Sequence, residues 1–153
     1  MSRGYFGVGI YHGKHEVNLG TLWRAAYLYD AAFIYTVGQR YTKRQASDTP
    51  HTQRHLPLFQ FATLDDLHAH LPRGCPLVAV ELDPRAVPLG EFTHPERAAY
   101  LLGAEDHGLP LSVLDRAHHV VQVETARPVS HNVAVAGALV LHHRHTSRVG
   151  ALA

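Results

Sequence analysis

Ser130 and Asn132 stand at the start of a segment of small and apolar residues that runs through Ala138. The segment follows a strand-like stretch, residues 119–124. A serine at the start of a helix can cap free backbone N–H groups, and the same groups can bind a polar part of a ligand. The two residues therefore predict either a capped, closely packed helix or a ligand site at its first turn.

Asn18 and Arg24 lie in a second candidate segment, which follows the apolar run of residues 5–10. Asn18 and Thr21 are both residue types that begin helices, and apolar residues recur at helical spacing after them. An arginine in such a helix can simply face solvent. Its guanidinium can instead meet a phosphate or a ribose, because its fork of donors matches phosphate oxygens.

Glu105 lies between Gly103 and Gly108 in a tight loop after the strand-like residues 99–102. Glycine permits positive φ and lets a ligand approach the backbone closely. Pro110 suits the first turn of the helix that follows. An acid between two glycines at the carboxyl end of a strand is typical of a ligand site.

Together the three segments resemble the SpoU/TrmH family of the SPOUT class of RNA methyltransferases. The first family motif, N-x-G-x-x-x-R, is similar to Asn18, Gly20 and Arg24. The second, G-x-E-x-x-G-L, is similar to Gly103, Glu105, Gly108 and Leu109. The third, S-L-N-V-(S/A)-V-A, is similar to Ser130, Asn132, Val133, Ala134, Val135 and Ala136, with His131 in place of the usual apolar residue. The motifs occur in the family's order and span most of the chain.

The resemblance implies a C-terminal trefoil knot whose loops bind S-adenosylmethionine (AdoMet) in a bent form. No metal is expected, because the sulfonium is itself a good leaving group. Carried over to this sequence, the cofactor-binding residues are Val80, Glu81, Leu102, Gly103, Gly108, Val121, Val123, Ser130 and Val133.

The reaction implied by the resemblance is methyl transfer to a ribose 2′-hydroxyl of RNA. The catalytic residues carried over are Arg24, Asn18, Glu105, Ser130 and Asn132. Because arginine stays protonated, positioning ribose or phosphate and stabilising a developing alkoxide suit Arg24 better than acting as the base. Small single-domain members of the family include enzymes that modify the tRNA wobble ribose, so the expected substrate is tRNA.

A homodimer with the active site at the subunit interface also follows from the resemblance. The apolar residues of the last helix, Leu139, Val140 and Leu141, are a candidate dimer surface. The alternative is that they are buried in the core of their own chain.

The elements that must position these residues alternate along the chain. Apolar patterning predicts strands over residues 5–10, 33–37, 58–61, 77–82, 99–102 and 120–123, and helices over 19–32, 64–71, 111–117 and 132–144. This alternation indicates an α/β fold with a mostly parallel sheet and helices on both faces. Ligands bind such sheets beyond the carboxyl ends of the strands.

Length and composition fit one domain over residues 1–153, with 46% apolar residues. No apolar segment reaches the length of a membrane span, and the N-terminus lacks the apolar core of a secretory signal. Cys75 is the only cysteine, which excludes an internal disulfide and favours a reducing cytoplasm. Its turn-like setting makes it a poor candidate nucleophile.

Basic residues crowd the polar stretch of residues 39–57, although the net charge of the chain is only +1. The stretch contains Arg40, Lys43, Arg44 and Arg54, with aromatic and histidine side chains interleaved. Together with Arg24 these cations are candidate RNA-binding residues, through phosphate contacts and stacking. The alternative is a solvated loop.

Fourteen histidines raise the question of metal binding. His142 and His145 could share a helix face, but no cysteine or nearby carboxylate completes a ligand set. Besides the methyltransferase, two functions stay open. One is a non-catalytic RNA-binding module that retains the SPOUT fold, and the other is a metal-responsive interaction protein.

Overall fold

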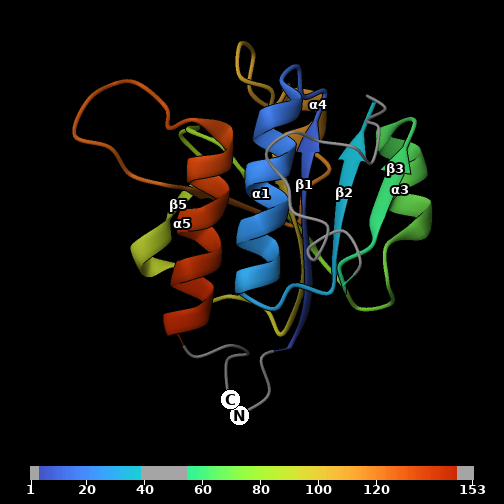
Figure 1. The fold of residues 1–153 in the computed structure, drawn as a ribbon. Coiled ribbons are helices and arrows are strands. Elements are labelled where there is room, and N and C mark those ends of the chain that lie inside the picture. The colour runs from blue at the N-terminus through green and yellow to red at the C-terminus, as the bar shows by residue number, and fades with distance from the viewer. Residues whose placement is uncertain (1–3, 39–54, 148–153) are drawn as a thin grey trace.

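The computed structural model describes residues 4–38 and 55–147 (Figure 1). Strands β1 to β3 are Tyr5–Tyr11, Phe33–Val37 and Leu58–Phe61, and strands β4 to β7 are Leu77–Val80, Val87–Pro88, Arg97–Leu102 and His119–Gln122. The helices are α1 Glu16–Leu28, α3 Leu64–His70, α4 Leu111–Leu114 and α5 Val133–Thr146, with a 3-10 turn, η1, at Leu89–Glu91.

The strands form one seven-stranded sheet in the order β3-β2-β1-β6-β4-β7-β5. Every pairing between these seven strands is parallel. The carboxyl ends of the strands therefore meet at one edge of the sheet, which is where ligands bind in folds of this kind.

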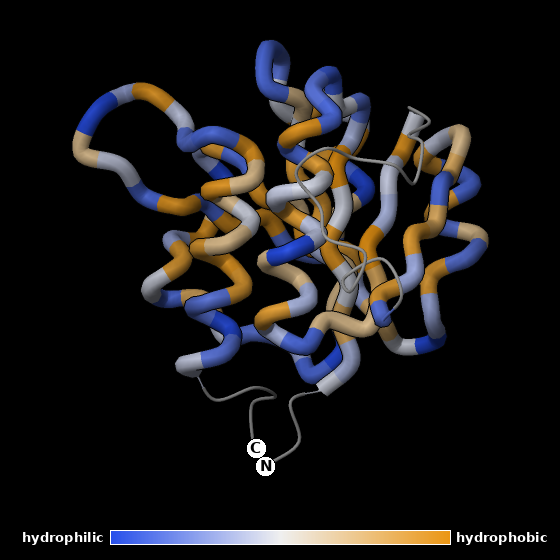
Figure 2. The backbone as a smooth tube through the Cα atoms, viewed as in Figure 1, coloured by the Kyte–Doolittle hydropathy of each residue, from blue (hydrophilic) through white to orange (hydrophobic). Residues whose placement is uncertain are grey.

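Two hydrophobic cores lie on opposite faces of the sheet. Successive residues of each central strand enter opposite cores. In β6, the first core contains Ala98, Tyr100 and Leu102, and the second contains Ala99 and Leu101. Helices α1 and α5 cover the first core, and α3 and α4 cover the second. Burial on both faces explains why the strands read as continuous apolar runs (Figure 2). The predicted α/β fold with helices on both faces is confirmed.

Helix α1 differs from its prediction at both ends. It begins at Glu16 and ends at Leu28, where Asp30 turns the chain with a φ of +63°. The expectation that Asn18 and Thr21 begin the helix was wrong. Asn18 lies buried within the first turn, and the Thr21 hydroxyl donates to the Val17 carbonyl one turn back at 2.8 Å.

Helix α5 packs side by side with α1 (Figure 1). Gly137 makes this approach possible, because a Cβ there would lie 2.4 Å from a Leu22 methyl group. Val140 and Leu141 are buried in the chain's own core, which corrects their assignment to a dimer surface. Leu139 is 38% exposed and remains available.

No helix within the described ranges is both long and apolar enough to cross a membrane. The boundary of the domain at residues 1–153 and the trefoil knot both remain predictions.

Candidate functional site

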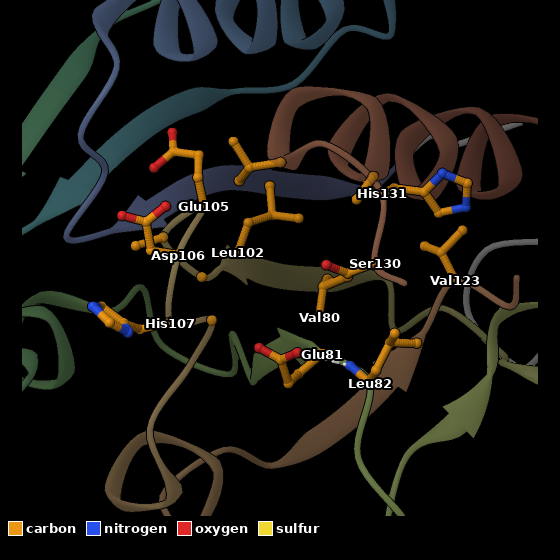
Figure 3. Close-up of a pocket in the computed structure, with 15 residues that line it drawn as sticks. Val80, Glu81, Leu82, Leu102, Glu105, Asp106, His107, Val123, Ser130 and His131 are labelled. Atoms are coloured by element: carbon orange, nitrogen blue, oxygen red, sulfur yellow. Dashed lines mark hydrogen bonds between the residues drawn. The ribbon is translucent and has the colours of Figure 1, made fainter. Parts of the chain in front are cut away.

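A cavity of about 250 Å³ opens at the carboxyl ends of β4, β6 and β7. Figure 3 shows Glu105, Asp106 and His107 at one end of its lining residues and Val123 and His131 at the other. Eight of the nine residues predicted to bind cofactor line this cavity: Val80, Glu81, Leu102, Gly103, Gly108, Val123, Ser130 and Val133. The motifs that are far apart in sequence therefore meet around one hollow.

Val121 is the exception, because it is fully buried and belongs to the core between the sheet and helices α1 and α5. Its carbonyl accepts the backbone N–H of Glu81 at 3.0 Å. Alternation along β7 directs this side chain into the core, so Val121 supports the cavity wall from behind.

The loop from Gly103 to Gly108 forms a tight floor beside Glu81. A Cβ at Gly103 would lie 2.3 Å from the Gly108 carbonyl carbon, and a Cβ at Gly108 would lie 2.3 Å from the Glu81 Oε2 atom. Gly108 also has a φ of +62°. The Glu81 carboxylate accepts the backbone N–H groups of Leu82 and Leu109 at 2.9 and 2.7 Å. Only glycine fits these two positions, and Glu81 ties the loop to β4.

A chain of hydrogen bonds joins the three sequence motifs. The Asn18 side-chain amide donates to Glu105 Oε1 at 2.6 Å, and the Asn132 amide donates to Asn18 Oδ1 at 3.1 Å. Asn132 Oδ1 in turn accepts the N–H groups of Ala134 and Val135, at 2.9 and 3.2 Å. The two asparagines thereby fix the cavity loop against the first turns of α1 and α5.

Asn132, and not Ser130, is the N-cap of α5. Ser130 lies two residues before the cap, exposed on the cavity lining. The prediction that this serine could cap the helix was wrong, and its hydroxyl is available to a ligand.

Hydrogen bonding favours the charged form of Glu105. Burial acts to raise the pKa of Glu105, but hydrogen bonds from its own backbone N–H, from Asn18 and from the Lys14 backbone N–H outweigh burial and hold the pKa below its ordinary value. Next to it, the Lys14 ammonium pairs with Asp106, which raises the pKa of Lys14 and lowers that of Asp106. With Glu81, the cavity has three carboxylates on its lining.

Several lining residues were not among the sequence candidates: Leu82, Ala104, Asp106, His107, His131 and Ala136. Asp106, His107 and His131 lie inside the motifs, so their position in a motif could have identified them as lining residues. Lys14 lies outside the motifs, and the sequence could not predict its contact with Glu105, because the two residues are 91 positions apart.

Arg24 lies exposed on α1 and does not line the cavity. The other predicted RNA-binding residues, Arg40, Lys43, Arg44 and Arg54, lie outside the described residues. Of the candidate cations, only Arg24 is described, and it does not lie at the cavity of its own chain.

The histidines form no metal cluster with other ligand types among the residues described. His142 instead contacts the Tyr29 hydroxyl at 3.2 Å. Cys75 is buried, and burial raises the pKa of its thiol, which disfavours a nucleophilic thiolate.

A parallel sheet with an acidic, glycine-floored cavity at its carboxyl edge defines an α/β protein that binds a small ligand at its strand ends. The model of the SpoU rRNA Methylase family matches residues 6–142, so the chain belongs to this family of RNA methyltransferases. A search of curated proteins found no significant match.

Solved structures of related folds superpose over nearly the whole chain. A protein from a study of the 2-OH methylation of C/U34 on tRNA has a TM-score of 0.79 at 22% identity, covering 93% of this chain and 89% of that chain. The AdoMet-bound rRNA methyltransferase of Sinorhizobium meliloti has a TM-score of 0.77 at 25% identity, over 92% of this chain and 56% of that chain. The A. aeolicus TrmH/SpoU tRNA modifying enzyme has a TM-score of 0.81 at 17% identity, over 92% and 73%. The chain has the fold of the SpoU/TrmH methyltransferases, as predicted.

Proposed function

We propose that the protein is an AdoMet-dependent RNA 2′-O-ribose methyltransferase that acts on tRNA. The observation that carries this proposal is the hydrogen-bonded chain from Glu105 through Asn18 to Asn132 at the wall of the cavity. It joins one residue from each of the three motifs on which the resemblance rests. Membership of the family establishes RNA methyl transfer as the reaction class, and we propose the ribose 2′-hydroxyl as the acceptor and tRNA as the substrate.

The cavity suits AdoMet in shape and charge. Its volume of about 250 Å³ lies just below the range of about 300–1,000 Å³ that is usual for small-molecule sites. The apolar side chains of Val80, Leu102 and Val133 offer a wall for a purine ring. Glu81 already accepts two N–H groups, but a carboxylate has about four acceptor positions, so ribose hydroxyls can bind it too.

When bound, AdoMet supplies a methyl group activated by a sulfonium. The acidic lining suits that positive charge, and the charged form of Glu105 is favoured by its three hydrogen bonds. Asn18 and Asn132 hold Glu105 and the start of α5 in place. Ser130, exposed on the lining, can donate to or accept from either reactant. Arg24 positions ribose or phosphate and stabilises developing negative charge.

A homodimer explains how Arg24 reaches a cavity that it does not line. Helix α1 carries an exposed stripe of residues at helical spacing: Val17, Thr21, Arg24 and Leu28. Val135 and Leu139 are exposed at the same spacing on the neighbouring α5, 47% and 38%. We propose that this surface, the α1/α5 face, packs against a second copy and delivers Arg24 to the partner's cavity.

The choice of tRNA rests on similarity and not on the cavity. The chain matches 89% of the length of the protein from the study of C/U34 methylation on tRNA. It matches only 56% of the length of the S. meliloti rRNA methyltransferase. We also propose a cytoplasmic location, since a single cysteine fits a reducing compartment. The trefoil knot is part of the same proposal.

The test is transfer of labelled methyl from AdoMet to bulk tRNA, with Arg24→Ala alongside. Nuclease digestion then identifies the methylated nucleoside. A 2′-O-methyl nucleoside that disappears with Arg24→Ala is the expected result. Transfer to rRNA alone would contradict the substrate, a base-methylated product would contradict the ribose position, and failure to bind AdoMet would favour a non-catalytic RNA-binding module.

A further inference from the structure

A second cavity, of about 440 Å³, lies beside the cofactor cavity and has no part in the function proposed above. Its lining comes from the residues that follow β1 and β2 and from the loop after β6, among them Tyr11, His12, Lys14, Gly38, His107 and Pro110. Ala104, His107 and Gly108 line both cavities. The loop that carries Glu105 is therefore a wall shared between the two.

The imidazole ring of His12 is held in a fixed place in this second cavity. His12 has a φ of +51°, and its backbone N–H donates to the Val37 carbonyl at 2.8 Å. Its ring packs on the backbone of Gly38, where a Cβ would lie 2.2 Å from His12 Nε2. Positive φ in a residue other than glycine persists where the surrounding structure holds it, and such positions concentrate at binding sites.

An aromatic partner completes the wall. The Tyr11 and His12 ring centroids lie 4.2 Å apart, with the ring planes inclined by 33°. Tyr11 is the last residue of β1 and His12 follows it, at the edge of the sheet where the cofactor cavity also opens. Two adjacent rings that are already in place offer an aromatic surface with little ordering left to do.

The charges around the second cavity favour a ring over a phosphate. The Lys14 ammonium is paired with Asp106, and the Lys14 backbone N–H donates to Glu105. The cation at the rim is therefore matched by carboxylates. Rings, a proline and glycine backbone make up much of the remaining wall. Proteins recognise unpaired RNA bases by stacking them on aromatic and histidine side chains.

We propose that the second cavity receives an unstacked base of the RNA substrate, stacked on the His12 and Tyr11 rings. This inference rests on RNA being the substrate, as in the function proposed above. A base held there lies across one loop from the cofactor cavity, so the shared wall sets the distance between the bound base and the methyl donor. His107, which lines both sides, is at the boundary.

The experiment measures the affinity of fluorescently labelled bulk tRNA for the full-length protein in the presence of S-adenosylhomocysteine. Two variants remove ring surface: Tyr11→Leu, and His12→Asn, since asparagine tolerates positive φ. His145→Asn is the matched control, because it removes an exposed imidazole from α5. Loss of one stacked base weakens binding by about fivefold to 150-fold. We expect a loss in that range for both cavity variants, unchanged tRNA affinity for the control, and unchanged AdoMet affinity for all three.

Equal tRNA affinity in the wild type and both cavity variants would overturn the proposal. If a variant also loses AdoMet binding, titration of the wild type with cytidine 5′-monophosphate decides. A shift in the imidazole NMR signals of His12, identified by their absence in His12→Asn, supports the site, and no shift overturns it. Binding that depends on His12 without any methyl transfer would refute the proposed function and leave the base site standing. Methyl transfer by the wild type, together with unaltered tRNA affinity in both cavity variants, would support the proposed function and refute the base site.

Discussion

Asn18 is the residue on which the site geometry depends most directly. It is buried, and both the nitrogen and the oxygen of its side-chain amide form hydrogen bonds: the nitrogen donates to Glu105 and the oxygen accepts from Asn132. We expect Asn18→Ala to lower the free energy of unfolding by about 1–3 kcal/mol, because it removes two part-buried hydrogen bonds, each worth about 0.5–1.5 kcal/mol. It should also reduce methyl transfer.

Urea denaturation measures this loss of stability. Thr146→Ala is the control, since its exposed hydroxyl bonds only to carbonyls of the turn before it. Such a surface change costs at most about 0.5 kcal/mol. An Asn18→Ala variant no less stable than the control would contradict the role assigned to the hydrogen-bond chain.

Gly108 and Gly74 form a matched pair for testing the cavity floor. Both have positive φ, +62° and +69°, but a Cβ at Gly108 would meet the Glu81 carboxylate whereas a Cβ at Gly74 meets nothing within 4 Å. Alanine at either position should cost about 1–2 kcal/mol of stability through the backbone. Only Gly108→Ala should weaken AdoMet binding, at least about tenfold. Isothermal titration calorimetry measures both affinities, and equal effects at the two positions would refute the steric account.

At the scale of elements, the sequence predicted the strands better than the helix ends. β2 and β3 have the predicted bounds; β2 is buried along its whole length and is a continuous apolar run, and β3 is a short aromatic-rich edge strand. The start of α1 was misplaced because asparagine suits both a cap and a buried hydrogen bond, and the partner of Asn18 is 87 residues away. β5 and η1 were missed because segments of two and three residues carry no detectable period.

The same limit applies to the candidate site. The resemblance supplies the spacing of the motif residues, and the structure brings several of them together at one cavity. Their roles in binding and catalysis stay predictions. Lys14 and the second cavity could not be predicted, because they depend on which loops the parallel sheet places side by side. The side chain of Val121 lies in the core and not on the cavity lining, because residues in a strand alternate between faces and a motif does not record which face.

Helix α5 is fastened at its far end by a buried polar network. The Arg144 guanidinium donates to the Pro95 carbonyl and to the Tyr100 hydroxyl, at 2.7 and 3.0 Å. Tyr100 then bonds His94 Nδ1 at 2.6 Å, and His94 Nε2 meets His143 at 2.8 Å. His94 is fully buried, and burial, aided by the charges of His143 and Arg144, lowers its pKa to about 3.

This network predicts a loss of stability in acid. His94 stays neutral in the folded chain down to about pH 3, whereas in the unfolded chain it takes up a proton near pH 6.5. The unfolded state therefore binds more protons between these values, and the stability contributed by neutral His94 is complete above pH 6.5 and lost as the pH falls. The loss amounts to a few kcal/mol at most. Urea midpoints measured from pH 7 to pH 4 should fall less steeply in His94→Gln than in the wild type.

His145→Gln serves as the control for that comparison, because it removes an exposed histidine from α5, outside the buried network. Its pH profile should match the wild type. A His94→Gln profile as steep as the wild type would show that other groups dominate the acid response.

At the scale of the whole molecule, the α1/α5 face is the surface we assign to a second copy. We expect Leu139→Arg to convert a dimer to a monomer, because it places a charge among the exposed apolar side chains of this face. Leu111→Arg is the matched control, since Leu111 is 64% exposed on α4, on the opposite side of the sheet. Analytical ultracentrifugation distinguishes the outcomes, and a dimer that survives Leu139→Arg would place the interface elsewhere.

The dimer proposal also makes a prediction about activity that no single-chain site can satisfy. At an AdoMet concentration well below the Kd of Gly108→Ala, both Arg24→Ala and Gly108→Ala should be nearly inactive, the first for lack of the arginine and the second for weakened AdoMet binding. In a mixed dimer, the intact arginine of one chain faces the intact cavity of the other, so one of the two sites is whole. Random exchange of subunits should therefore restore up to about a quarter of wild-type methyl transfer. If Arg24 instead served the cavity of its own chain, every site in the mixture would carry a defect and the mixture would stay as inactive as its components.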